Sequence, residues 1–406
     1  MSTNPKRAHR ERAAAKPQAV ESVADMTLQT VAGAMIAIGV IAFASALIRG
    51  AAAIAWEAYL VNLLFFLGVA QGGVVASAAF YLTQAKWGGS TLYRLGEAFA
   101  PFLWVGFFLF FGLYFGRSAI FPWVTHPIAQ KAAWLNTPFL FARDGIGLGV
   151  MAAASFAFIR VSRGDDARAW TIATDDIELP PHSIRVLAPL VAVLFAVVYT
   201  LISFDLVMSL APVWRSTLFG WYFFAGAFWS ALTAMALTAV VLRARLGENN
   251  LFTNPIVMHD FGKMVFAFSV FWVYLVFAQY IVIWYGDLPV ETFFIVQRVH
   301  HMPWSPLSVA CLALIWLIPF TALMSVRAKK RPLILGSVAG LGLVGMWLER
   351  YVLVVPSLSL DAIPFGLTQF LISIAFLGAF LISAVRGLNR VAQAATSGEP
   401  FGDGAE

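Results

Sequence analysis

Ten long apolar stretches, separated by short polar segments, dominate the pattern of residues along this chain. Each stretch has roughly 20 or more residues, the length that an α-helix needs to cross the hydrocarbon core of a bilayer. The pattern therefore predicts an all-α integral membrane protein with ten transmembrane helices. The predicted spans lie near residues 28–48, 57–82, 96–116, 139–159, 184–210, 218–242, 259–285, 306–326, 332–354 and 366–386.

The composition agrees with this class and excludes several others. Of the 406 residues, 60% are hydrophobic and 12% are charged, and the mean hydropathy is +0.80, far above that of a soluble domain. The net charge of +6 comes from short basic clusters between the apolar stretches, so we expect the lipid bilayer as a partner and no nucleic acid. Cys311 is the only cysteine, too few for a disulfide framework, a zinc site or thiolate ligation of an iron–sulfur cluster.

The basic residues also predict the orientation in the membrane. Of the 27 lysines and arginines, 19 fall on the side of the N-terminus, 7 fall on the opposite side, and Lys263 lies inside a span. Because cytoplasmic segments carry the excess of Lys and Arg, we expect both termini in the cytoplasm. We interpret residues 1–27 as a disordered basic tail, 28–390 as the membrane domain and 391–406 as a polar tail.

Ionisable residues within or beside the spans are the candidates for function, because charged groups in a bilayer are costly. On the cytoplasmic side, His259, Asp260 and Lys263 begin the seventh span at spacings that bring the histidine and the aspartate within reach of the lysine. Glu97, near the start of the third span, could join them in an inner set that takes up protons. The alternative is an ordinary helix terminus, at which Asp260 favours the helix dipole and Lys263 extends towards water.

An outer set gathers on the opposite side. Asp205 lies roughly 8 Å inside the end of the fifth span at 1.5 Å per residue. A proton path or a purely structural Arg–Asp pair would both explain such a set, which comprises Arg143, Asp144, Asp205, Gln279, Glu349 and Arg350. The residues between the two sets are weak relays only, namely Asn62, Gln71, Tyr199, Ser203 and Tyr274. These residues are consistent with two proton half-paths that meet in the middle of the membrane. They are equally consistent with a sealed apolar core that has polar residues only at its two ends.

Some chemistry is excluded by what the sequence lacks. Bis-histidine haem binding requires two histidines in facing spans, and only His259 touches a span. The sequence has neither a glycine-rich phosphate loop nor a dinucleotide-binding motif. We therefore expect no metal, haem or nucleotide bound by this chain.

Several motifs resemble one family of membrane proteins. The chain resembles the NrfD-like membrane subunits of alternative complex III, a bacterial quinol:electron acceptor oxidoreductase, over about residues 30–390. The motifs are FDLVMSL at 204–210, then PVWRSTLFGWYFF, HDFGK, FWVY and QYIVIWYGDLPVE. EAYLVNLLFFLGVAQGG and KAAWLNTPFLFARD look like the smaller, ActF-type member of the two such subunits.

The resemblance implies an architecture and a set of partners. It implies two face-to-face four-helix bundles, formed by spans two to five and six to nine, with two flanking helices, in the bacterial inner membrane. The implied partners are a larger NrfD-like twin that binds menaquinol or another quinol, an iron–sulfur subunit and c-type cytochrome subunits with haem c. Asp205 matches the family's aspartate in its D-x-x-M-S-L segment, and His259, Asp260 and Lys263 match its HDxGK cluster.

The sequence departs from the family at the place where a quinol would be deprotonated. Ala211 and Val213 replace an acidic residue and a histidine of the family's S-L-D-P-H-W segment, and Val290 replaces the first glutamate of LPEE. We therefore expect a subunit without its own redox centre that supports its quinol-oxidising twin in a respiratory or photosynthetic chain and conducts protons.

An alternative keeps quinol chemistry in this chain. In that hypothesis the subunit itself binds and oxidises quinol at the outer membrane face. His126 or Asp144 would act as the base, and Trp123 and Trp134 would stack on the ring. A third possibility, an independent secondary transporter, is disfavoured because the spans lack midspan charges and paired Gly-Pro interruptions.

Overall fold

The computed structural model describes residues 26–85, 89–164, 179–246 and 255–396. All regular elements in these ranges are helices, and no strand occurs among them. Ten helices of the described part are long and apolar enough to cross a membrane, and they confirm the ten predicted spans. Residues 1–25 of the predicted basic tail and 397–406 of the predicted polar tail lie outside the described residues.

The first half of the chain supplies five spans. α2 and α3 form the first two, α4 and α5 together form the third, α8 forms the fourth, and α10 with η3 and η4 forms the fifth. Short helices α6, α7 and η2 connect the third span to the fourth. The elements are α2 (Met26–Ile48), α3 (Ala52–Leu82), α4 (Gly89–Glu97), α5 (Pro101–Gly112), α6 (Arg117–Ile120), α7 (Pro122–Thr125), η2 (Ala129–Lys131), α8 (Thr137–Ser162), α10 (His182–Ile202), η3 (Ser203–Val207) and η4 (Met208–Leu210).

The second half supplies the other five. α11 and α12 form spans six and seven, α14 with η5 and α15 forms span eight, and α17 and α18 form the last two. The elements are α11 (Phe219–Leu246), α12 (Pro255–Gly286), α13 (Pro289–Val299), α14 (Trp304–Leu312), η5 (Ala313–Leu317), α15 (Ile318–Ala322), α16 (Val326–Lys330), α17 (Pro332–Val354), η6 (Val355–Ser357) and α18 (Leu367–Thr396). α18 thus continues to Thr396, into the stretch predicted as a tail.

Local sequence explains several of the helix breaks. Pro101 begins α5, since a proline in the first turn gives up no helical hydrogen bond. The side chain of Asn136 accepts a hydrogen bond from the Phe139 amide and so caps α8. η5 is a π-helical turn directly before Pro319, whose missing amide leaves a carbonyl of the preceding turn without its usual partner.

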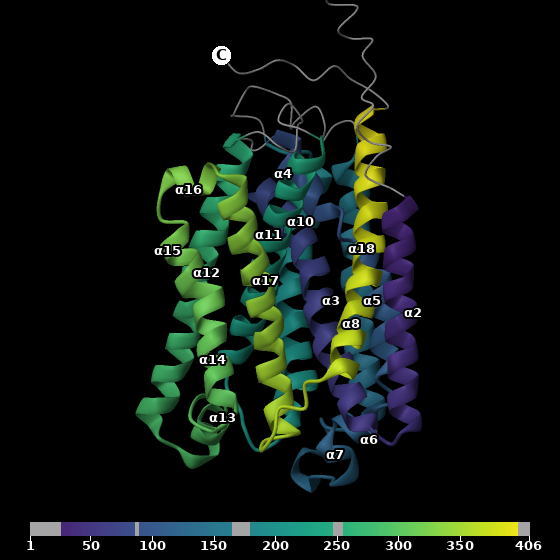
Figure 1. The fold of residues 1–406 in the computed structure, drawn as a ribbon, viewed down its shortest axis with the longest axis vertical. Coiled ribbons are helices and arrows are strands. Elements are labelled where there is room, and N and C mark those ends of the chain that lie inside the picture. Colours follow the sequence, from purple (N-terminus) through teal and green to yellow (C-terminus); the bar gives the residue numbers. More distant parts are fainter. Residues whose placement is uncertain (1–25, 86–88, 165–178, 247–254, 397–406) are drawn as a thin grey trace, which may run out of the picture.

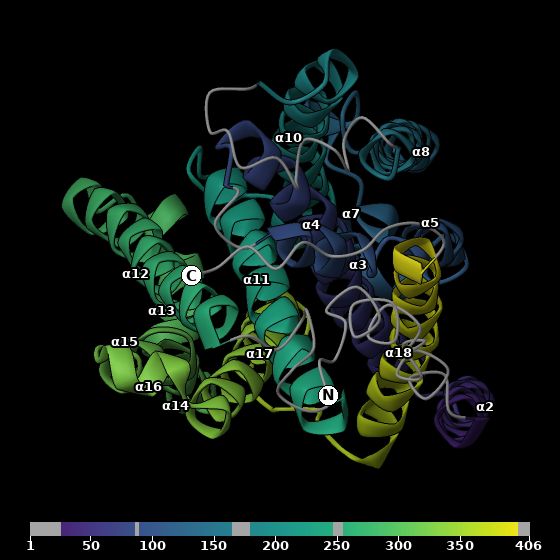
Figure 2. The same cartoon turned by 90° about the horizontal axis from the view of Figure 1, so that it is seen from above.

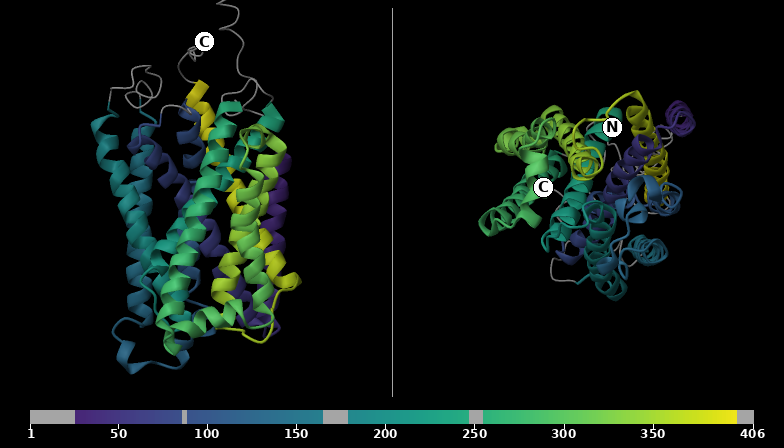
Figure 3. Two further views of the ribbon diagram at one scale, coloured as in Figure 1. Left: turned by 90° about the vertical axis from the view of Figure 1, so that its left-hand side faces the viewer. Right: turned by 90° about the horizontal axis from the view of Figure 1, so that it is seen from below.

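α3 is the centre of the molecule and is almost entirely buried. It packs against α4, α5, α10, α11, α17 and α18, whereas α8 lies farther out against α10 and α5. Small residues permit the closest of these contacts: a Cβ added to Gly72 would lie 2.8 Å from the carbonyl oxygen of Ala227 on α11. α2 and α18 pair at one edge, and α12 to α17 gather on the side away from them (Figures 2 and 3).

The molecule has two ends that matter for the site. α2 begins and α18 ends at the same end, which we call the near end (Figure 1). The opposite end, where α7 and α13 lie, is called the far end (Figure 1). Because the helices run between these two ends, a residue's position along its helix gives its depth in the protein.

Candidate functional site

Asp205 lies at the centre of a buried ionic cluster at the far end. The Nε and Nη2 atoms of Arg143 lie 2.8 and 2.7 Å from Asp205 Oδ2, and the indole N–H of Trp134 donates to Asp205 Oδ1 at 2.9 Å. The guanidinium carbon of Arg143 also lies 3.8 Å from the centre of the Trp134 ring, a cation–π contact. With Asp144, described next, these residues form the far-end cluster.

Asp144 gives this cluster a second carboxyl group. It is only 1% exposed, and no donor of the described residues hydrogen-bonds to either of its oxygens. The carboxyl group of Asp144 interacts electrostatically with the carboxyl group of Asp205 and with the guanidinium of Arg143. Two carboxyl groups therefore face one guanidinium, and the cluster is electrically neutral when it holds one proton. A buried, uncompensated charge costs several kcal/mol, and one of the two carboxyl groups is in excess of what the single guanidinium can balance.

The backbone near Asp205 is specialised. Asp205 lies in η3, a π-helical turn of Ser203–Val207 at the end of the fifth span. A π turn accommodates one more residue than an α turn and so changes the direction of the side chains around it. The hydroxyl of Ser209 donates to the carbonyl oxygen of Asp205 at 2.5 Å, which holds the end of this turn.

A second buried carboxylate, that of Glu97, lies at the near end. Its Oε2 atom accepts a hydrogen bond from Arg163 Nε at 2.9 Å and lies 3.5 Å from Arg94 Nη1. The hydroxyl of Ser162, at the end of α8, donates to the other oxygen. We call Arg94, Glu97, Ser162 and Arg163 the near-end cluster. Glu97 is fully buried, and the side chain of Arg163 is 22% exposed, so the cluster reaches the surface through that arginine.

The inward face of α8 carries buried polar residues at three levels, one in or beside each cluster and one between them. Asp144, Ser155 and Ser162 are all buried, and steps of about three and two turns place them on one side of the helix. Halfway along, the amide nitrogen of Gln71 on α3 donates to the Ser155 hydroxyl at 2.9 Å, and the amide oxygen of Gln71 has no donor among the described residues. This line, the α8 seam, runs about 27 Å at 1.5 Å per residue, close to the thickness of the hydrocarbon core.

The predicted inner set falls into two separate groups. Asp260 Oδ1 lies 2.6 Å from Lys263 Nζ, as their spacing on α12 predicted, and 3.8 Å from His259 Nδ1. α12 packs there against α16, so closely that a Cβ on Gly262 would lie 2.8 Å from the Cβ of Lys329. Glu97 pairs instead with arginines of the first half of the chain, and the expectation that it joins His259 is corrected. Glu97 lies at the near end, as its position in the span predicted, but its partners lie on α4 and at the end of α8 and not on α12.

The predicted outer set also divides. Arg143, Asp144 and Asp205 belong to the far-end cluster, whereas Glu349 and Arg350 lie on α17 in the second half. Arg350 Nη1 is 3.1 Å from Glu349 Oε2, and its Nη2 donates to the carbonyl oxygen of Phe223 at 3.0 Å. The hydroxyl of Tyr222 donates to Glu349 Oε1. Gln279 lines a cavity beside this group.

The predicted middle relay is partly corrected. Gln71, Tyr199 and Ser203 are buried, and the Tyr199 and Ser203 hydroxyls donate to the carbonyl oxygens of Leu67 and Thr200, each at 2.7 Å. Tyr274 is 60% exposed on the outer surface of α12 and lines no path through the interior. Asn62 is engaged in packing, since its side chain bonds Trp347 on α17 and Ser373 on α18, each at 2.9 Å.

The four residues of the alternative quinol site lie in different surroundings. Trp134 and Asp144 share the far-end cluster, but Trp134 already contacts Asp205 and Arg143. Trp123 is buried against Phe121, with ring centres 5.3 Å apart, and His126 is exposed on the far-end surface.

Sequence reasoning missed several polar residues that the structure brings into prominence. Ser155, Ser162 and Tyr222 resemble ordinary packing residues in a membrane span, and only their partners reveal them. Glu57 had a visible signal, a carboxylate inside an otherwise apolar run; it is buried on α3 and accepts a hydrogen bond from Ser359 at 3.4 Å.

Comparison with known proteins does not add to this picture. The chain matches no known family model, and no curated protein sequence resembles it significantly. Within the described ranges, no group of three or more His, Cys, Asp or Glu residues could hold a metal ion. The functional interpretation therefore rests on the motifs and on the geometry above.

Proposed function

We propose that this chain is an NrfD-like, ActF-type membrane subunit of an alternative complex III and that it conducts protons for the quinol oxidation carried out by its larger twin. The observation that carries the proposal is the α8 seam. It runs from a cluster with one carboxyl group in excess at the far end towards a buried glutamate at the near end, over roughly the thickness of a bilayer core.

In this proposal a proton is exchanged at each end. At the far end Arg143 stays paired with the Asp205 carboxylate, and the carboxyl group in excess, that of Asp144, carries the proton. At the near end Glu97 receives protons from the cytoplasm beside the partly exposed Arg163. The Ser155 hydroxyl and the Gln71 amide lie between, and water between these groups would complete the path.

The protein's own part is to hold these groups without a solvent leak. α8 shields the seam on one side and α3 on the other. Quinol oxidation in the twin would shift the helices and change which side the far-end cluster faces, so that the bound proton leaves on the far side. Glu97 takes the near-end role in preference to His259, because Glu97 is fully buried on the seam whereas His259 lies on α12 beside α16.

The proposal also includes the arrangement in the membrane. The helices of spans two to five and six to nine would be the two facing four-helix bundles, which the contacts of α3 with α11 and α17 support. The near end would be cytoplasmic, as the distribution of basic residues favours. The bacterial inner membrane, quinol, the iron–sulfur subunit and the c-type cytochrome subunits enter from the family resemblance.

Purification from native membranes tests the assignment to a complex. An affinity-tagged chain, extracted in mild detergent, is expected to bring with it a homologous membrane subunit, an iron–sulfur subunit and haem c, seen in the reduced-minus-oxidised absorbance spectrum. A chain that purifies alone and colourless, but fully folded, would contradict membership of such a complex.

A further inference from the structure

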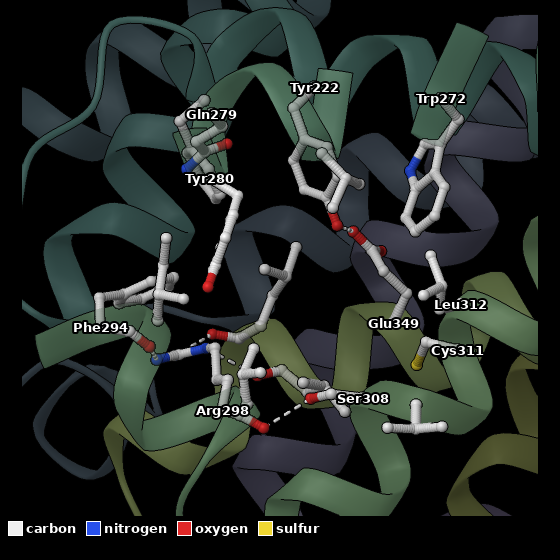
Figure 4. A pocket seen from close by; sticks show the side chains of 17 residues that line it. Tyr222, Trp272, Gln279, Tyr280, Phe294, Arg298, Ser308, Cys311, Leu312 and Glu349 are labelled. Carbon is white, nitrogen blue, oxygen red and sulfur yellow. Dashed lines mark hydrogen bonds between the residues drawn. The ribbon is translucent and has the colours of Figure 1, made fainter. Parts of the chain in front are cut away.

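The near end of α12 carries a group of basic side chains that has no part in the α8 seam. The cavity that Gln279 lines lies towards the other end of this helix (Figure 4). At the near end α12 packs against α16, which follows the eighth span, ending at Ala322, and precedes the ninth, beginning at Pro332 (Figure 1). A short helix between the ends of two spans lies at the border of the bilayer, at the level of the lipid headgroups. The α12–α16 basic group comprises His259, Lys263, Lys329 and Lys330.

The α12–α16 basic group carries more positive charge than its described neighbours balance. His259 interacts electrostatically with the ammonium groups of Lys263, Lys329 and Lys330 and with one carboxylate, that of Asp260. Asp260 Oδ1 lies 2.6 Å from Lys263 Nζ, so this carboxylate is already paired. The charges of Lys329 and Lys330 have no such partner among the described residues. Two ammonium groups in excess favour an anion at this place.

Lys329 is the member of the group that most needs an anion. Its side chain lies against Gly262, is only 9% exposed, and brings Nζ to 4.9 Å from the centre of the Phe266 ring. No carboxylate, hydroxyl or carbonyl group of a described residue pairs with this Nζ, although buried charges in proteins are normally paired. The Nζ atom is not one of the fully enclosed unpaired atoms, so an anion can reach it from outside.

Exposed apolar side chains flank the basic group along the chain. Met324, Val326 and Leu333, before, in and after α16, are 61, 55 and 82% exposed. Arg327 and Arg331 are exposed among them. Exposed cations beside exposed apolar side chains match the two parts of a phospholipid, because the cations face its phosphate and the apolar side chains face its acyl chains. A soluble phosphate compound would make use of the cations alone.

We propose that the α12–α16 basic group binds the headgroup phosphate of an anionic phospholipid in the adjoining leaflet of the bilayer. Lys329 and Lys330 contact the phosphate oxygens, while Lys263 stays with Asp260. The acyl chains lie against the apolar residues around α16, of which Leu333 is the most exposed. The site requires neither proton conduction nor a particular partner subunit.

Native mass spectrometry of the full chain, with any subunits that copurify, tests this lipid site. The protein is freed of lipid in a neutral detergent and titrated with phosphatidylglycerol or with phosphatidylcholine of the same acyl chains. Both lipids carry a phosphate, but the choline group cancels its charge, so we expect the first phosphatidylglycerol to bind at least about tenfold more tightly than the first phosphatidylcholine. Equal binding of the two lipids would overturn the proposal and would leave the basic group to an acidic segment of another protein.

Two double variants separate this site from the general effect of positive charge. Lys329→Met with Lys330→Gln removes both unbalanced charges, keeps an apolar stem beside Phe266, and should abolish the preference for phosphatidylglycerol. Arg386→Gln with Arg390→Gln removes two exposed charges of α18 at the same end but at the opposite edge, and should bind as the native chain does. A native preference in the lysine variant, or the same loss in both variants, would contradict a site at α16.

Two further measurements test the source of the phosphate and the state of Lys329. Glycerol 1-phosphate in large molar excess should leave the bound phosphatidylglycerol in place, because it lacks the acyl chains, and displacement would refute a lipid site. In lipid-free detergent, Lys329→Met should unfold at the native temperature or above it, because the substitution removes an unpaired buried charge. A lower unfolding temperature would show that the ammonium group is already satisfied within the protein.

Discussion

The two aspartates of the far-end cluster should differ sharply in what they contribute to stability. Asp205 accepts from Arg143 and Trp134, and removing one partner of a buried ion pair costs about 3–5 kcal/mol. Asp144 can take over part of the guanidinium charge, so Asp205→Asn is expected to lower the free energy of unfolding by about 3 kcal/mol, the lower limit of that range. Asp144 accepts no hydrogen bond, and an asparagine of the same shape removes none and can donate to Asp205. We expect Asp144→Asn to change stability by less than about 1 kcal/mol.

Reversible unfolding in mixed micelles measures this difference. Sodium dodecyl sulfate is titrated into mild-detergent micelles, and tryptophan fluorescence reports the unfolded fraction for the native chain, both single variants and the double variant. The double variant should lose more than the sum of the single losses, because Arg143 then has no carboxylate at all. Equal losses for the two single variants, or a larger loss for Asp144→Asn, would refute the assignment of Asp144 as the surplus carboxyl group.

Substitutions at Asn62, Glu97, His259 and Tyr274 test individual contacts. Asn62→Ala removes the two hydrogen bonds that tie α3 to α17 and α18 and should lower the unfolding free energy in the same assay by about 1 kcal/mol, at roughly 0.6 kcal/mol per membrane hydrogen bond. A change near zero would contradict this role. Glu97→Gln should slow proton uptake from the near end in proteoliposomes, whereas His259→Leu should not, and the opposite order would favour the α12 residues. Tyr274→Phe should change neither stability, beyond about 0.5 kcal/mol, nor proton transport, because the Tyr274 side chain lies on the exposed outer face of α12. A loss of transport in this variant would show that Tyr274 does belong to the proton path.

The sequence was sufficient to predict the ten membrane-spanning segments, because the thickness of a bilayer sets the length of apolar chain that each one needs. Each apolar stretch of the sequence corresponds to one membrane-spanning segment of the structure. This holds even for the third and eighth spans, whose helices are interrupted at Pro101 and before Pro319 although their sequences are continuously hydrophobic. The same runs carried no sign of the π turn at Asp205. That turn depends on how the end of the fifth span packs, and no residue type in Ser203–Val207 requires it.

Lateral position was the part that could not be predicted. Distance from a span's end places Glu97 and His259 at the same depth, but only the packing of α4 against α3 and of α12 against α16 separates them. Tyr274 illustrates the same difficulty on a single helix, since every face of α12 is apolar and hydropathy does not distinguish its inner face from its outer one. Serines such as Ser155 gained significance only from their partners, here Gln71.

Quinol-driven proton translocation by the purified complex in proteoliposomes shows whether protons pass through the far-end cluster. Proton release is followed with a pH-sensitive dye while quinol oxidation is recorded in the same sample. Asp144→Asn should oxidise quinol at the native rate yet translocate no protons through this chain, whereas Asp361→Asn, the same change at an exposed site, should behave as the native complex does. Native proton release by Asp144→Asn would contradict a path through the far-end cluster.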